Sequence, residues 1–175
     1  MALFSKDIET LDDLFVHTLQ TTYYAEQQIV DALAKMADMA SSPELKAGFE
    51  QHRAESQVQA ERLEQVFRMH GHEPKATDCP AFDGIKKAND ATASDIDDKA
   101  VLDAALAGGA QLVEHYEIAQ YGKLIAWAKA LGRDDCASVL AQSLAEEKAT
   151  DEKLTQLAES SLNRPAAAAR SSADA

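Results

Sequence analysis

Carboxylates interrupt the apolar stripes of four segments in which hydrophobic residues recur every three to four positions. A buried carboxylate without a partner is costly in free energy and usually needs a cation or a proton. Near the middle of the four stripes stand Glu26, Glu55, Glu117 and Glu146. Four carboxylates with a nearby histidine form a hard, oxygen-rich set of donors that suits a pair of iron or manganese ions. The sequence therefore predicts a two-metal site.

Neighbouring polar residues compete for these positions. On the second stripe, His52 lies one turn before Glu55 and Gln59 lies one turn after it, so both are candidates beside it. On the third and fourth stripes the sequence does not decide between Glu114 and Glu117, between Glu146 and Glu147, or between Thr150 and Asp151. The candidate metal ligands are Glu26, His52, Glu55, Glu114, Glu117, Glu146 and Glu147.

An internal repeat relates the two halves of the chain. Residues 55–65 align without gaps on residues 146–156. In the same register, Glu55 follows Glu26 by 29 residues and Glu146 follows Glu117 by 29 residues. Two such units, packed face to face about a pseudo-two-fold axis, are expected to bring these four carboxylates together in the centre.

The periodicity predicts four long helices, over residues 8–39, 43–70, 99–131 and 135–161. Ser42 and Pro43 suit the start of the second helix, Gly132 the end of the third, and Asp134 the cap of the fourth. Residues 72–98 form a long connection, with a short helix near residues 85–88.

This connection lets the third helix begin at the far end of the second, which is the ferritin-like plan. The expected fold is therefore all-α, an antiparallel four-helix bundle with one long crossover connection between helices two and three. Residues 1–161 are expected to form this bundle. Residues 162–175 are expected to form a disordered Ala/Ser-rich tail.

Composition restricts the class of function. The chain has 175 residues, and 30 Asp and Glu against 17 Lys and Arg leave a net charge of −13. That surface repels phosphate backbones and anionic lipids, so no nucleic acid and no membrane partner is expected. Neither an export signal nor a long apolar run is visible, which predicts a cytoplasmic protein. Cys79 and Cys136 fit no metal or redox spacing.

Three stretches carry a family resemblance: residues 113–122 with Glu-His-Tyr-Glu, residues 146–154, and the Cys-Pro-Ala-Phe of residues 79–82. Over about residues 5–160 the sequence resembles the YciE/YciF-type stress-associated proteins of the ferritin-like superfamily. The resemblance implies a dimeric, bacterial, cytosolic protein that is induced under stress and holds two metal ions. Related di-iron proteins commonly carry Glu-x-x-His on helices two and four, but here Val58 and Ala149 occupy the histidine positions.

The leading hypothesis is a di-metal protein of the oxidative or metal stress response. Its cofactors would be two Fe ions, with Mn as an alternative, and its partners metal ions, O2 or peroxide and a second copy of the chain. A ferroxidase- or peroxidase-like oxidation of Fe(II) would be its reaction. The alternative is a metal-free helical bundle that acts as a scaffold or interaction module under stress.

Overall fold

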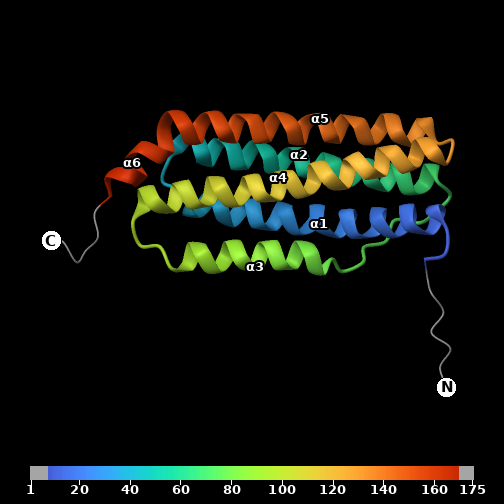
Figure 1. Cartoon of the computed structure of the whole chain (residues 1–175), viewed down its shortest axis with the longest axis horizontal. Helices are drawn as coiled ribbons and strands as arrows, with labels where there is room; N and C mark the ends of the chain where they lie inside the picture. The colour runs from blue at the N-terminus through green and yellow to red at the C-terminus, as the bar shows by residue number, and fades with distance from the viewer. Residues whose placement is uncertain (1–7, 170–175) are drawn as a thin grey trace, which may run out of the picture.

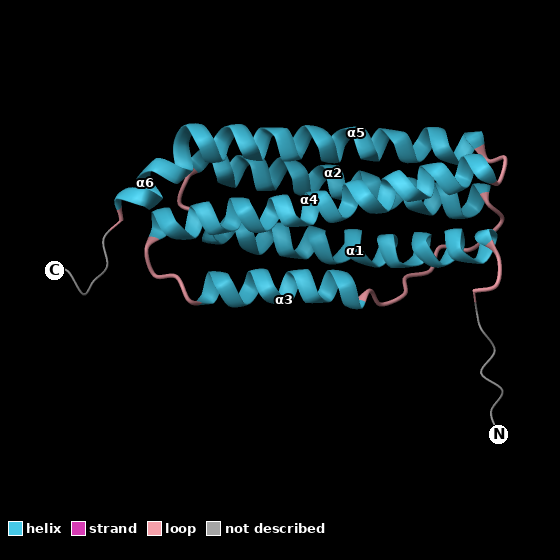
Figure 2. Cartoon of the chain, in the orientation of Figure 1, coloured by secondary structure: helices cyan, strands magenta, loops and turns pink. Residues whose placement is uncertain are grey.

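The computed structural model describes residues 8–169, and all its regular elements are helices, as Figures 1 and 2 show. The all-α prediction is therefore confirmed for this range. The long helices are α1 (Leu11–Met39), α2 (Pro43–Met69), α4 (Lys99–Ala130) and α5 (Asp134–Leu157). The shorter elements are α3 (Pro80–Ser94), a π-helical turn η1 (Ala158–Leu162) and α6 (Asn163–Ala168).

The four long helices pack side by side around a common interior. α1 packs against α2 and α4, and α5 packs against α4 and α2. α3 lies along α4, and the colours of Figure 1 show that it carries the chain back along the length of the bundle. As a result α2 and α4 run in the same direction, and α1 and α5 run in the opposite one. No helix within residues 8–169 is long and apolar enough to cross a membrane.

Local signals in the sequence set most helix ends. The Ser42 side chain accepts a hydrogen bond from the Leu45 amide and Pro43 opens α2, as predicted. Gly132 adopts a φ of +71°, the left-handed conformation that ends α4. The predicted cap at Asp134 is wrong, because α5 already begins there and Arg133 precedes it without a side-chain capping bond.

α3 extends well beyond the short helix predicted near residues 85–88. Pro80 opens it, and Phe82 is buried at its first turn beside the Tyr116 ring. The Cys79 sulfur lies 3.0 Å from the Tyr116 hydroxyl, at the same junction. These contacts come from α4 and fix a segment whose own sequence is too polar to predict a helix of this length.

The chain stays helical past residue 162, where the sequence predicted the start of a disordered tail. Leu162 is 5% exposed and joins the apolar core, and the alanines that follow favour helix, so α6 reaches Ala168. The rest of the predicted tail, residues 170–175, and residues 1–7 of the predicted bundle lie outside the described residues.

The core has two apolar parts with polar side chains between them. One part lies towards the α1–α2 turn and includes Leu33, Phe49 and Leu106. The other lies towards the α4–α5 turn and includes Phe15, Leu63 and Leu124. The apolar parts close the two ends of the layer between them, where the predicted site residues fall.

Candidate metal centre

Each long helix contributes buried polar side chains to the middle of the bundle. The most buried of them, all between 0% and 3% exposed, are Thr22 and Glu26 from α1, His52, Ser56 and Gln59 from α2, Glu114 and Glu117 from α4, and Ser143 and Glu147 from α5. Burial of charged groups at this density requires neutralisation by protons, by each other or by a cation.

Four of these residues converge closely. His52, Glu114, Glu117 and Glu147 each offer a ligand atom, and these atoms lie within 4.8 Å of one another. The His52 Nε2 atom lies 3.0 Å from Glu114 Oε1 and 4.0 Å from Glu147 Oε2. Glu26 interacts electrostatically with Glu117 and Glu147, and we refer to these five residues as the carboxylate cluster.

Most oxygens of the carboxylate cluster have no protein partner. The Tyr121 hydroxyl donates a hydrogen bond to one oxygen of Glu26. Glu114 Oε1 has only its ion-pair contact with His52, and the other oxygen of Glu26, Oε2 of Glu114 and both oxygens of Glu117 and Glu147 have no hydrogen-bond partner. Buried polar groups are nearly always satisfied, so these oxygens fit direct bonds to one or more hard cations.

The pKa values of the cluster also favour a bound cation. Burial raises the pKa of Glu147 to about 10 and that of Glu26 to about 7, and burial also raises the pKa of Glu117 well above its usual range. Burial lowers the pKa of His52, but Glu114 and Glu55 outweigh this effect and raise it to about 10. The metal-free cluster therefore retains protons that a bound cation would displace.

The structure does not bring Glu55 and Glu146 into the carboxylate cluster. The Glu55 side chain is 27% exposed, and one of its oxygens lies 3.8 Å from His52 Nδ1. The Glu146 side chain is 31% exposed and is bound by Arg62 and by Gln59. The expectation that both face the centre is wrong, whereas Glu26 and Glu117 do lie there.

The reason is a one-residue difference in helix register. In the internal repeat, Ser56 aligns with Glu147, and both are 0% exposed. The two repeats therefore fold alike, but in each of them the buried residue is the one directly after the predicted residue: Ser56 after Glu55, and Glu147 after Glu146. Ser56 is a buried residue of the site that was not predicted from the sequence, and its place in the repeat was the available signal. Only α5 carries a carboxylate there.

The polar residues that flank the predicted ligands divide between the interior and the rim of the site. Gln59 is fully buried, and its amide donates to Glu146 at 3.0 Å. Thr150 is 8% exposed, one turn from Glu147. Asp151 lies outside the cluster, where it accepts a hydrogen bond from Gln111. On α4 no choice is needed, because Glu114 and Glu117 both face inward.

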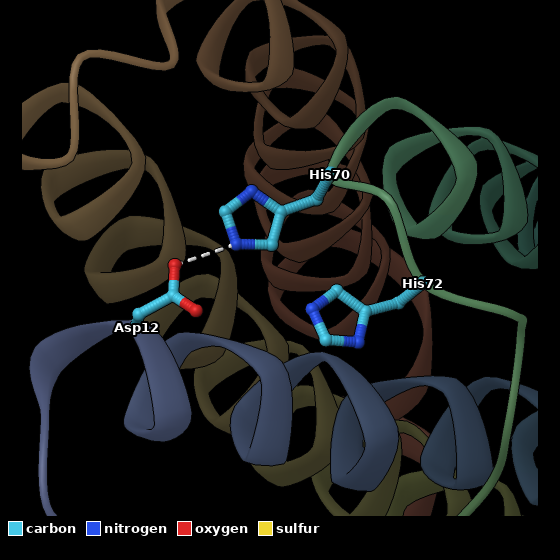
Figure 3. Close-up of side chains that lie close together, drawn as sticks. All are labelled: Asp12, His70 and His72. Atoms are coloured by element: carbon cyan, nitrogen blue, oxygen red, sulfur yellow. Dashed lines mark hydrogen bonds and ion pairs between the residues drawn. The ribbon is translucent and has the colours of Figure 1, made fainter.

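A second group of possible ligands lies at the end of the bundle, where Figure 3 shows Asp12 facing His70, with His72 alongside. His70 Nε2 lies 2.8 Å from Asp12, and its Nδ1 lies 3.0 Å from Arg133. Arginine can only donate, so Nδ1 accepts and Nε2 carries the proton towards Asp12. This arrangement ties three chain segments together and leaves His70 no free lone pair for a metal.

Fold and site together define an all-helical bundle protein with a buried cluster of glutamates and one histidine. Residues 10–167 match the family model described as a domain of unknown function, DUF892, so the chain belongs to the DUF892 family.

Relatives agree with this assignment. Over 162 residues the chain is 43% identical to protein YciF of Escherichia coli, covering 91% of this chain and 97% of the relative. The crystal structure of the E. coli stress protein YciF matches with a TM-score of 0.84 and 40% identity, over 89% of this chain and 99% of that one.

A second solved structure is similarly close. YcfI of Rhodopseudomonas palustris, whose name proposes a structural role, matches with a TM-score of 0.85 and 52% identity, over 87% of this chain and 98% of that one. The resemblance to YciF-type stress proteins is thus confirmed.

Proposed function

We propose that the chain is a ferritin-like four-helix bundle, with α3 on the crossover, whose carboxylate cluster binds two iron ions in a stress response. Manganese is the alternative metal. The parallel directions of α2 and α4 support the ferritin-like assignment, since a simple up-and-down bundle would make these two consecutive long helices antiparallel. The name of one relative, the E. coli stress protein YciF, supports the role in stress.

The observation that carries the proposal is the set of buried carboxylate oxygens without partners. Without a metal, Oε2 of Glu114 and both oxygens of Glu117 and Glu147 would remain buried with no hydrogen-bond partner. A pair of divalent cations would neutralise the charge and use these oxygens as ligands. Four glutamates and one histidine make a donor set that lacks the usual second histidine, so ligands from water are expected to complete it.

Iron held there would supply one-electron chemistry for the oxidation of Fe(II) by O2 or peroxide, which is the proposed ferroxidase- or peroxidase-like activity. The chain's own groups would prepare the site. Tyr121 fixes the orientation of Glu26 through its hydrogen bond, and Glu55 faces the outer nitrogen of His52. The apolar parts of the core keep bulk water away from both ends of the polar layer.

Glu55 retains a part in this proposal as an outer carboxylate. A cavity of about 300 Å³, which we call the polar cavity, reaches from the bundle surface to His52 and Glu114. Glu44, Glu55 and Lys153 are among the charged residues that line it. A partly exposed carboxylate at this place can bind a hydrated cation before the cation reaches the buried ligands.

The decisive experiment is an anaerobic titration of metal-stripped protein with Fe(II), followed by addition of O2 or peroxide. Binding of about two ions per chain, then a ferric-oxo absorption band, is the expected result. Mn(II) in a parallel titration tests the alternative metal. Failure of both metals to bind would overturn the proposal.

The second candidate is a metal-free scaffold or interaction module, again in a stress response. It is favoured by the contact of His52 with Glu114 and by the Tyr121–Glu26 hydrogen bond, which satisfy part of the cluster without an ion. The name of YcfI points the same way. In that case the melting temperature would not respond to metal. A homodimer is proposed for either function, and sizing chromatography tests it.

A further inference from the structure

A second cavity reaches the same histidine and glutamate from beneath α3. It has a volume of about 190 Å³ and lies between α1, α3 and α4. Its walls are mainly apolar and include Ile29, Leu33, Met36, Phe82, Leu106 and Val113. We call it the apolar cavity. The polar cavity opens between α2 and α5. The two cavities have only His52, Ala110 and Glu114 in common.

The helix that covers the apolar cavity, α3, is held in place by polar contacts at its first turn and at its middle. The Tyr24 hydroxyl donates to Asp83 at 2.9 Å, and the Asn89 amide donates to the Gly109 carbonyl at 2.9 Å. A Cβ atom at Gly109 would lie only 3.1 Å from the Asn89 side chain, so glycine permits this close approach of α3 to α4. These contacts fix the position of α3 over α4 and thereby define the apolar cavity between them.

Polar groups stand at the inner end of this apolar space. Glu114 is 1% exposed; its Oε1 lies 3.0 Å from His52 Nε2, and its Oε2 has no hydrogen-bond partner. His52, 3% exposed, also lines the cavity. An apolar wall with one buried acceptor at the end is the usual composition of a small-molecule site, in which the walls give affinity and the polar group gives orientation.

We infer that the apolar cavity binds a small aromatic molecule whose single hydrogen-bond donor faces Glu114. The size is suitable, because an apolar cavity of about 150 Å³ in another protein binds benzene. The donor follows from Glu114 Oε2, which has no hydrogen-bond partner. This inference goes beyond the metal proposal and concerns the metal-free chain, because a bound metal ion would use the same Glu114 oxygens as ligands.

The test uses the full-length, metal-free protein with phenol as the probe, followed by calorimetry and by the shift in melting temperature. Saturable binding of phenol is expected, with benzene roughly tenfold weaker because it cannot donate to a carboxylate. Ala32→Leu and Ala105→Leu fill the apolar cavity from α1 and α4, and each is expected to abolish binding. Both alanines are partly exposed within helices, so a leucine is tolerated there.

Gly48→Leu is the matched control, because Gly48 lines the polar cavity only and has open space around a Cβ atom. It is expected to bind phenol as the unmodified chain does. The inference is overturned if phenol does not bind, if both alanine variants bind it unchanged, or if benzene binds as tightly. Because no metal is added, none of these results bears on the Fe(II) titration.

Discussion

Arg62 of α2 donates hydrogen bonds to both oxygens of Glu146 of α5, at 2.5 Å from Nη1 and 2.8 Å from Nη2. This pair sits at the rim of the polar layer and holds Glu146 against the surface of the bundle. The next residue, Glu147, is fully buried in the carboxylate cluster. Two consecutive glutamates thus have different roles, one as an ion-pair partner and the other as a candidate ligand.

The first prediction separates these two roles. Glu147→Gln is expected to lose most of the stability that Fe(II) adds, about 2.7 kcal/mol at a hundredfold excess over the dissociation constant. The isosteric Glu146→Gln is expected to keep that gain, because it changes only a partly exposed ion pair worth about 1 kcal/mol or less. Thermal melts with and without Fe(II) measure both. Loss of the gain in Glu146→Gln alone would contradict the assignment of Glu147 as the ligand.

The second prediction concerns access of the cation. Glu55→Gln is expected to slow the binding of Fe(II) about tenfold at low salt, since it removes the outer carboxylate beside His52. The final stoichiometry should not change, because Glu55 lies outside the carboxylate cluster. Anaerobic stopped-flow mixing measures the rate. Glu50→Gln, an exposed change on the same helix, is the control. An equal binding rate in the unmodified protein and in both variants would show that Glu55 does not assist entry of the cation.

The third prediction is a dependence of stability on pH in the metal-free protein. Glu26, Glu117 and Glu147 have raised pKa values when folded, and His52 does too. A raised folded pKa contributes stability that is complete below the unfolded value and is lost as the pH rises through the folded value. For Glu147 that window runs from 4.5 to about 10. The melting temperature should therefore fall steadily between about pH 5 and pH 9.

Bound metal should reverse this trend, because metal binding releases the protons of its ligands and strengthens as the pH rises. Glu147→Gln cannot ionise and should show a shallower decline without metal. Melts of the two proteins across this pH range, with and without Mn(II), provide the measurement. A decline of the same slope in both metal-free proteins would show that another group dominates.

The fourth prediction tests a contact that holds the bundle rather than its site. Asp103 of α4 is 4% exposed and accepts from the Ser41 and Ser42 amides, both at 2.8 Å, and from the Ser41 hydroxyl at 2.6 Å. Asp103→Ala leaves these donors of the α1–α2 turn unpaired and should lower the free energy of unfolding by about 2–3 kcal/mol. Urea unfolding measures it. Asp103→Asn keeps one acceptor oxygen and should lose less of the free energy of unfolding. The Fe(II) stoichiometry should stay unchanged in both variants.

Much of the fold could be predicted because its signals are local. Pro43 and Gly132 mark helix ends by their backbone geometry alone, and the position of Glu26 and Glu117 follows from long apolar stripes on both sides. α3 was underestimated for the opposite reason. Its helical state depends on Phe82 packing against Tyr116, a contact between residues far apart in the sequence.

The sequence by itself determined that helices would form, roughly where they would end, and that carboxylates would interrupt their apolar faces. Only the tertiary structure decided which carboxylates face inward. Successive residues of a helix differ by about 100° in direction, so Glu146 and Glu147 both fit a broad apolar stripe. The choice between them depends on how α5 is rotated against α2, and there Arg62 binds Glu146 at the rim while the buried layer receives Glu147.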